Sequence, residues 1–63
     1  MTKLIDSGMV GSIEVGVLKD EETGEISVSM TSLTNENTIA TLNLCQTELL
    51  ASTLFEIFDR YSD

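Results

Sequence analysis

The sequence predicts a small α+β domain, in which an antiparallel β-meander of about three strands packs one face against a single C-terminal α-helix. Three stretches alternate apolar and polar residues, as strands with one buried face do. One later stretch instead repeats apolar residues at intervals of three and four, which is typical of an amphipathic helix. The chain of 63 residues contains no proline and no linker-like segment, so we expect residues 1–63 to form one domain.

The first two strands are predicted to form a hairpin within residues 9–33. In the loop between them, Asp20 can accept hydrogen bonds from nearby amides, and Gly24 can adopt the left-handed conformation that closes a hairpin. An even number of loop residues places the apolar sides of both strands on the same face of the sheet. In residues 1–8, Leu4 and Ile5 could form a short strand or pack under the sheet, whereas Asp6-Ser7-Gly8 is typical of a turn, so we leave this segment unassigned.

A third strand is predicted over residues 38–44, and the helix follows directly over residues 45–61. The short turn before this strand would set Met30 near Leu42. We expect the helix to cover the sheet and to complete one apolar core. The residues of this predicted core are Ile13, Val15, Val17, Ile26, Val28, Met30, Leu42 and Leu44 of the sheet, and Leu50, Leu54, Ile57, Phe58 and Tyr61 of the helix.

The helix start is predicted at Cys45 or at Thr47. Glu48 stands three residues after Cys45, as in a capping box, although serine or threonine usually occupies the cap. At this position the positive end of the helix dipole would make the thiol more reactive. The more ordinary interpretation is a small, half-buried residue at the junction of strand and helix.

The small size of the chain predicts self-association. A domain of this length buries only about 60% of its unfolded surface, so a lone core is marginal without a disulfide or a metal. One cysteine and no histidine provide neither. We therefore expect a homodimer, formed through an edge strand or through the hydroxyl-rich face of the sheet. The residues predicted for this contact are Ser27, Ser29, Thr31, Leu33, Ile39 and Thr41.

Charge is the clearest feature of the composition. Eleven acidic residues against three basic ones give a net charge of −8, which argues against direct binding to nucleic acid or to an anionic membrane. No apolar run is long enough to span a bilayer, and the first residues lack the apolar core of a signal peptide. We expect a cytoplasmic protein, and the single cysteine agrees with a reducing compartment.

No motif in the sequence predicts catalysis, a cofactor or a metal. Residues 20–25 group carboxylates beside a glycine, but they lack the alternating ligands and the distal glutamate of a calcium loop. Most of the acids fall on predicted turns or on the outer helix face, which leaves no pocket for a pair of catalytic carboxylates. We therefore expect a protein that is not an enzyme.

Two binding functions follow from these features. In the first, an acidic surface imitates the phosphates of nucleic acid and occupies the basic groove of a host nucleic-acid-binding or defence protein. In size and charge the chain resembles phage-encoded inhibitors of this kind, although no motif carries the resemblance. The carboxylates predicted to bind the partner are Asp20, Glu21, Glu22, Glu25, Glu36, Glu48, Glu56 and Asp59. In the second, a homo-oligomer sequesters a small ligand or serves as a structural or regulatory subunit.

Overall fold

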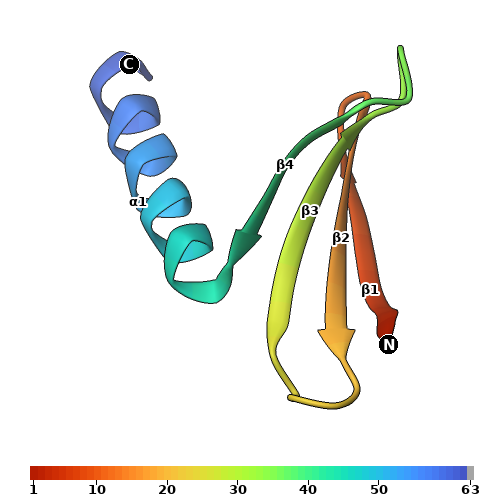
Figure 1. Cartoon of the computed structure of the whole chain (residues 1–63). Helices are drawn as coiled ribbons and strands as arrows, with labels where there is room; N and C mark the ends of the chain where they lie inside the picture. Colours follow the sequence, from red (N-terminus) through yellow and green to blue (C-terminus); the bar gives the residue numbers. More distant parts are fainter. Residues whose placement is uncertain (63) are drawn as a thin grey trace.

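The computed structural model describes residues 1–62, and it shows a four-stranded antiparallel sheet followed by one helix (Figure 1). The elements are β1 (Thr2–Val10), β2 (Ile13–Asp20), β3 (Ile26–Ser32), β4 (Thr38–Asn43) and α1 (Leu44–Tyr61). Neighbours in the chain are neighbours in the sheet, in the order β1-β2-β3-β4. The predicted meander with a C-terminal helix is confirmed, with one strand more than expected.

The additional strand, β1, occupies the segment that the sequence left unassigned. It is joined to β2 by the two-residue turn Gly11-Ser12, in which Gly11 adopts a φ of 61° that a residue with a side chain rarely takes. The sequence pattern hides this strand because a β-bulge between Leu4 and Asp6 shifts the register and interrupts the alternation. Residues 9 and 10, predicted to begin the β2–β3 hairpin, end β1 instead.

The β2–β3 hairpin has the predicted geometry. Asp20 Oδ1 accepts a hydrogen bond from the Glu22 amide at 2.9 Å, and Gly24 takes a φ of 75°. The Gly24 amide also donates to the Asp20 carbonyl at 2.7 Å, which closes the turn. Val17 pairs with Val28 across the two strands, so the apolar residues of both lie on one face, as expected.

The register between β3 and β4 differs from the prediction. Met30 pairs with Ala40 rather than with Leu42. The turn closes where the Ser32 amide donates to the Asn37 carbonyl at 2.9 Å, so β4 starts to pair earlier along the chain than we expected. The shift is even, so the apolar residues of β4 remain on the predicted face.

The helix begins one residue earlier than predicted, because Asn43 is its N-cap. The Gln46 amide donates to Asn43 Oδ1 at 2.7 Å, and the Asn43 amide donates to Gln46 Oε1 at 3.0 Å. Asparagine is among the best capping residues, and this reciprocal capping box satisfies two amides at once. The predicted caps at Cys45 and Thr47 are therefore wrong. Cys45 is exposed in the first turn, not half-buried at a junction.

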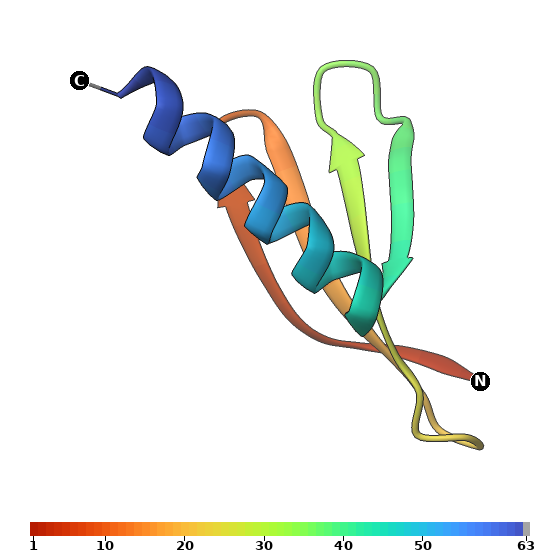
Figure 2. The ribbon, with the colours of Figure 1, turned by 90° about the vertical axis from the view of Figure 1, so that its left-hand side faces the viewer.

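The predicted core forms only in part. Helix α1 approaches β3 and β4 but neither β1 nor β2, and it diverges from the sheet along its length (Figure 1). Seen from the helix side, α1 runs diagonally in front of the strands (Figure 2). Val28, at 9% exposure, is the one buried apolar side chain among the described residues. The radius of gyration is 13.3 Å, whereas a compact chain of this length has about 10.6 Å.

Candidate protein-interaction surfaces

The largest candidate site is an apolar surface that the chain leaves uncovered between α1 and the sheet. We call it the open apolar layer. It consists of Leu50, Leu54, Ile57, Phe58 and Tyr61 of α1, and of Ile13, Val15, Val17, Ile26, Met30, Ala40 and Leu42 on the sheet face that lies toward α1. The helical and sheet residues of this layer are half-buried or exposed.

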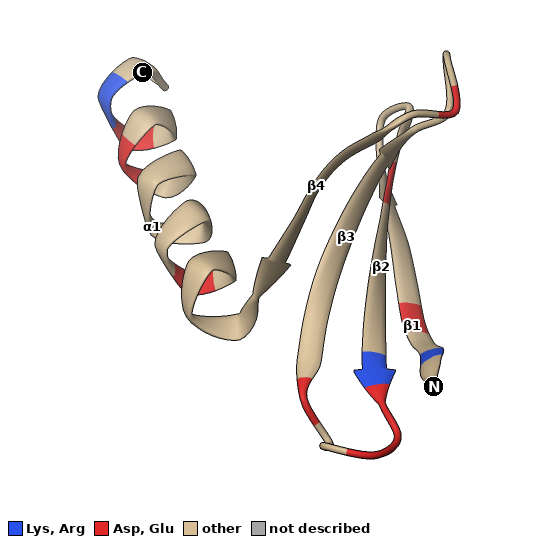
Figure 3. Ribbon diagram, viewed as in Figure 1, with Lys and Arg blue, Asp and Glu red and all other residues tan. Residues whose placement is uncertain are grey.

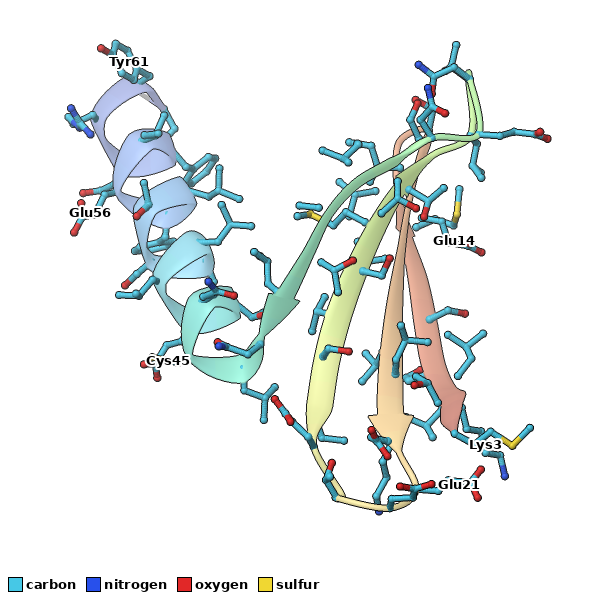
Figure 4. The ribbon with its side chains drawn as sticks, viewed as in Figure 1. Lys3, Glu14, Glu21, Cys45, Glu56 and Tyr61 are labelled. Atoms are coloured by element: carbon cyan, nitrogen blue, oxygen red, sulfur yellow. The ribbon has the colours of Figure 1, made fainter. Side chains whose placement is uncertain are left out.

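Exposure within the layer is highest at the C-terminal end of the helix, although Ile57, at 43%, is less exposed than its neighbours in the layer. Leu50, in the second turn, is half-buried. The exposed fraction is 56% for Leu54, 64% for Phe58 and 79% for Tyr61. In Figure 4, Tyr61 lies at the far end of α1, on the side of the molecule away from β1. The first turn of α1 follows β4 directly, whereas the later turns lie progressively farther from the sheet (Figure 1).

The accessible surface area shows how much more surface this chain exposes than a compact protein of the same mass. The chain has an accessible area of 5035 Å², whereas a compact protein of its mass, 6.9 kDa, exposes about 4,000 Å². The excess of about 1,000 Å² is comparable to the roughly 800 Å² that each partner buries in a protein–protein interface of standard size. Scattered exposed leucines are ordinary, but apolar residues gathered on α1 and on the sheet face toward it form a candidate binding site.

The opposite face of the sheet contains four of the six residues predicted for self-association. Ser27, Ser29, Thr31 and Thr41 lie on this face, where Thr41 pairs with Ser29 across β3 and β4. We call it the hydroxyl face. Leu33 lies beyond the end of β3, where its amide donates to the Ser12 carbonyl at 2.9 Å, and Ile39 lies at an irregularity of β4.

Strand β1, which the sequence did not predict, changes the hydroxyl face. Leu4 pairs with Leu18 on this face and reaches over Gly16, where a built Cβ would lie 3.1 Å from the Leu4 Cδ1 atom. The absence of a side chain at Gly16 therefore makes room for Leu4. The leucine at position 4 was the available signal, but the bulge beside it concealed the strand.

The eight carboxylates predicted to bind a partner do not form one surface. Asp20, Glu21, Glu22 and Glu25 are at the tip of the β2–β3 hairpin, Glu36 is in the β3–β4 turn, and Glu48, Glu56 and Asp59 are on α1 (Figure 3). The two turns lie at opposite ends of the sheet, as antiparallel connections require. The structure therefore separates the predicted acidic surface into three groups.

Positive groups offset most of the charge at the hairpin tip. The terminal amino group of Met1 lies 4.0 Å from Asp20 Oδ1 and 3.9 Å from Glu22 Oε1. Lys3 and Lys19 are paired in register directly beside the tip. Four carboxylates against these three cations leave a local charge of −1 (−4 + 3). These ion pairs are exposed, so they contribute little to stability. The cations nevertheless reduce the negative electrostatic potential at the hairpin tip.

The carboxylates of α1 form no ion pair within residues 1–62. Glu48, Glu56 and Asp59 lie on the side of the helix opposite its apolar stripe, and Figure 4 shows Glu56 pointing away from the sheet. Within residues 1–62, no lysine or arginine side chain forms an ion pair with a carboxylate. We call these three residues the outer acidic row.

The described residues hold no pocket, and no three of their His, Cys, Asp and Glu side chains are grouped as a metal site requires. In the part of the chain that the structure describes, no helix is both long enough and apolar enough to cross a membrane. Comparison with protein families, curated proteins and solved structures finds no match to this chain.

Proposed function

We propose that this protein is a non-enzymatic, cytoplasmic protein that acts through protein–protein contact as a homodimeric structural or regulatory subunit. The open apolar layer is the observation that carries the proposal. A chain with one buried apolar side chain has too little core of its own, and a partner that covers the layer supplies the missing burial.

Native mass spectrometry of the gently purified protein tests this proposal. A homodimer has a mass of 13.8 kDa, twice the 6.9 kDa of the chain. A discrete additional mass on the dimer would identify a bound small molecule and assign the protein to ligand sequestration, for which the hydroxyl face offers polar groups. A stably folded monomer at high micromolar concentration would refute the proposal.

A second candidate function is inhibition of a basic host protein in the manner of phage-encoded nucleic-acid mimics. The outer acidic row supports it, because its carboxylates are exposed, lie on one side of α1 and form no ion pair within residues 1–62. Arg60, beside Asp59, leaves the row a local charge of −2 (−3 + 1), against −1 at the hairpin tip. Glu48 and Glu56 are separated by about 12 Å along the helix axis, so the row is an extended anionic strip. A dimer formed through the open apolar layer would leave this strip accessible.

Matched charge reversals test the second candidate. We expect Glu48→Lys with Glu56→Lys to abolish binding to the basic protein that co-purifies in native mass spectra. The control, Glu21→Lys with Glu22→Lys, makes the same change in net charge at the hairpin tip, where nearby cations already offset the carboxylates, so binding should weaken only slightly. The opposite ranking of the two double variants would contradict a role of the outer acidic row.

A further inference from the structure

The width of the sheet requires two helices to cover one face. Strands lie about 4.8 Å apart, so four of them span roughly 15–19 Å. A helix with its side chains is about 10 Å across and covers two strands. The described residues 1–62 form one helix, which approaches only β3 and β4, so the same face of the sheet over β1 and β2 has room for a second helix.

The helix has a wider apolar sector than a single contact needs. Leu50 faces the sheet, whereas Phe55 lies about 140° further around the helix axis. The Phe55 and Phe58 rings lie 6.5 Å apart, and Phe55 is 67% exposed. A sector of this width allows one helix to pack on a sheet and against a neighbouring helix at the same time.

On the sheet face that carries Val15 and Val17, strand β1 has space for an incoming side chain at Gly8, between Asp6 and Val10. Gly8 pairs with Val15, so a side chain at position 8 would project from the same face as Val15, Val17 and Val28. No atom lies within 4 Å of a Cβ built on Gly8. The position is therefore open within the chain.

We propose that two copies of the chain interlock through their helices, an inference that rests on the proposed homodimer. The C-terminal half of α1 of each copy packs on β1 and β2 of its partner, beside the partner's own helix. The contact is two-fold symmetric, so the same residues contribute from both copies. The occupant is a second copy because the uncovered area, about 1,000 Å² per chain, matches one side of a standard interface. The apolar surfaces that would meet are both present in this chain: α1 on one side, and Val15 and Val17 of β2 with Val10 of β1 on the other. Asp6 of β1 lies on the same face, where it pairs with Val17, and marks the charged border of this surface.

A pair of lysine substitutions on β1 tests the site of contact. Gly8→Lys places a charge in the layer without a clash inside the chain, whereas Ser7→Lys adds the same charge to the adjacent residue, on the hydroxyl face opposite Gly16. We expect Gly8→Lys to raise the dimer dissociation constant at least about tenfold, because the long side chain fills the space that the partner's helix would occupy and its ammonium, even beside Asp6, loses contact with water. We expect Ser7→Lys to leave it unchanged. Analytical ultracentrifugation measures both constants.

The outcomes separate this inference from the proposed function. A monomeric wild-type protein refutes both. A wild-type dimer that dissociates with Ser7→Lys, but not with Gly8→Lys, refutes the interlocked helices and assigns assembly to the hydroxyl face.

An experiment on the wild-type protein avoids any effect of substitutions on folding. In a dimer mixed from isotope-labelled and unlabelled chains, filtered NOE spectra report contacts between copies only. We expect contacts from the Phe58 ring of one chain to the Val15 and Val17 methyl groups of the other. If these contacts occur only within one chain, α1 closes on its own sheet and the inference is wrong.

Discussion

The stability of this protein should depend strongly on its concentration. The chain exposes about 1,000 Å² more than a compact protein of its mass, and slightly more than half of such surface is apolar. At about 25 cal/mol per Å², the missing apolar burial corresponds to about 14 kcal/mol. The entire free energy of unfolding of a domain this short is about 3–9 kcal/mol. We therefore expect the folded single chain to be unstable and its folding to be coupled to association.

If folding is coupled to association, the dependence of stability on protein concentration can be calculated. When a folded dimer unfolds to two chains, each tenfold rise in concentration stabilises the dimer by about 1.4 kcal/mol. With a urea dependence of about 2 kcal/mol per molar, the midpoint of unfolding rises by about 0.7 M per tenfold change. Circular dichroism at the helical band, recorded at about 5 µM and about 500 µM protein, should therefore show midpoints about 1.4 M apart.

Superimposable urea curves at the two concentrations would refute this reasoning. They would show that one chain folds alone and that α1 covers the sheet without a partner. A further check uses the slope of the transition, which reports the surface exposed on unfolding. An unchanged slope at both concentrations is expected for a single transition from dimer to unfolded chains.

Three further predictions concern local features and charge. Asn43→Ala removes the helix cap and should lower the free energy of unfolding by about 1 kcal/mol in urea titrations, and no loss would contradict the capping box. Gly11→Ala forces a side chain into a φ of 61° and should lower the free energy of unfolding by about 1–2 kcal/mol, and an unchanged value would contradict the left-handed turn at Gly11. Sodium chloride should raise the thermal midpoint, because a dimer of two chains of charge −8 repels itself and salt screens this repulsion. Within residues 1–62 no lysine or arginine side chain forms an ion pair that salt would weaken. A lower midpoint in salt would indicate that attractive charge pairs dominate.

The sequence predicted the elements that depend on residues close together in the chain, namely the β2–β3 hairpin and the helix. The β2–β3 hairpin follows from the alternation of its strands and from the turn chemistry of Asp20 and Gly24, and all of these are visible in the chain. The helix follows from its apolar period. Its start was misplaced because Asn43 was assigned to the strand, although asparagine followed three residues later by glutamine is a recognisable capping signal.

The features that sequence reasoning missed depend on contacts between elements. Strand β1 was hidden because a bulge beside Leu4 breaks its alternation, and only the pairing with β2 reveals the strand. The core was overestimated because the apolar period shows which side of α1 is apolar but not what covers it. Phe58 belongs to the apolar stripe as predicted, yet it is 64% exposed. The acidic surface was overestimated because pairing of β1 with β2, which we did not predict, brings Lys3 and the terminal amino group of Met1 beside the hairpin tip.

The two edges of the sheet bear on how assembly would stop at two copies. An exposed edge strand invites addition of further strands, which leads to open-ended association. Here both edge strands are irregular, since β1 has a bulge between Leu4 and Asp6, and the pairing of β4 shifts register near Ile39. Bulges twist an edge and disfavour the addition of a strand, and Lys3 on β1 adds charge to the same edge. A face-to-face contact through the open apolar layer is instead closed by its two-fold symmetry. With both edges unsuited to pairing, the uncovered area is best buried by one partner, and the charge of the resulting dimer opposes the approach of a third chain.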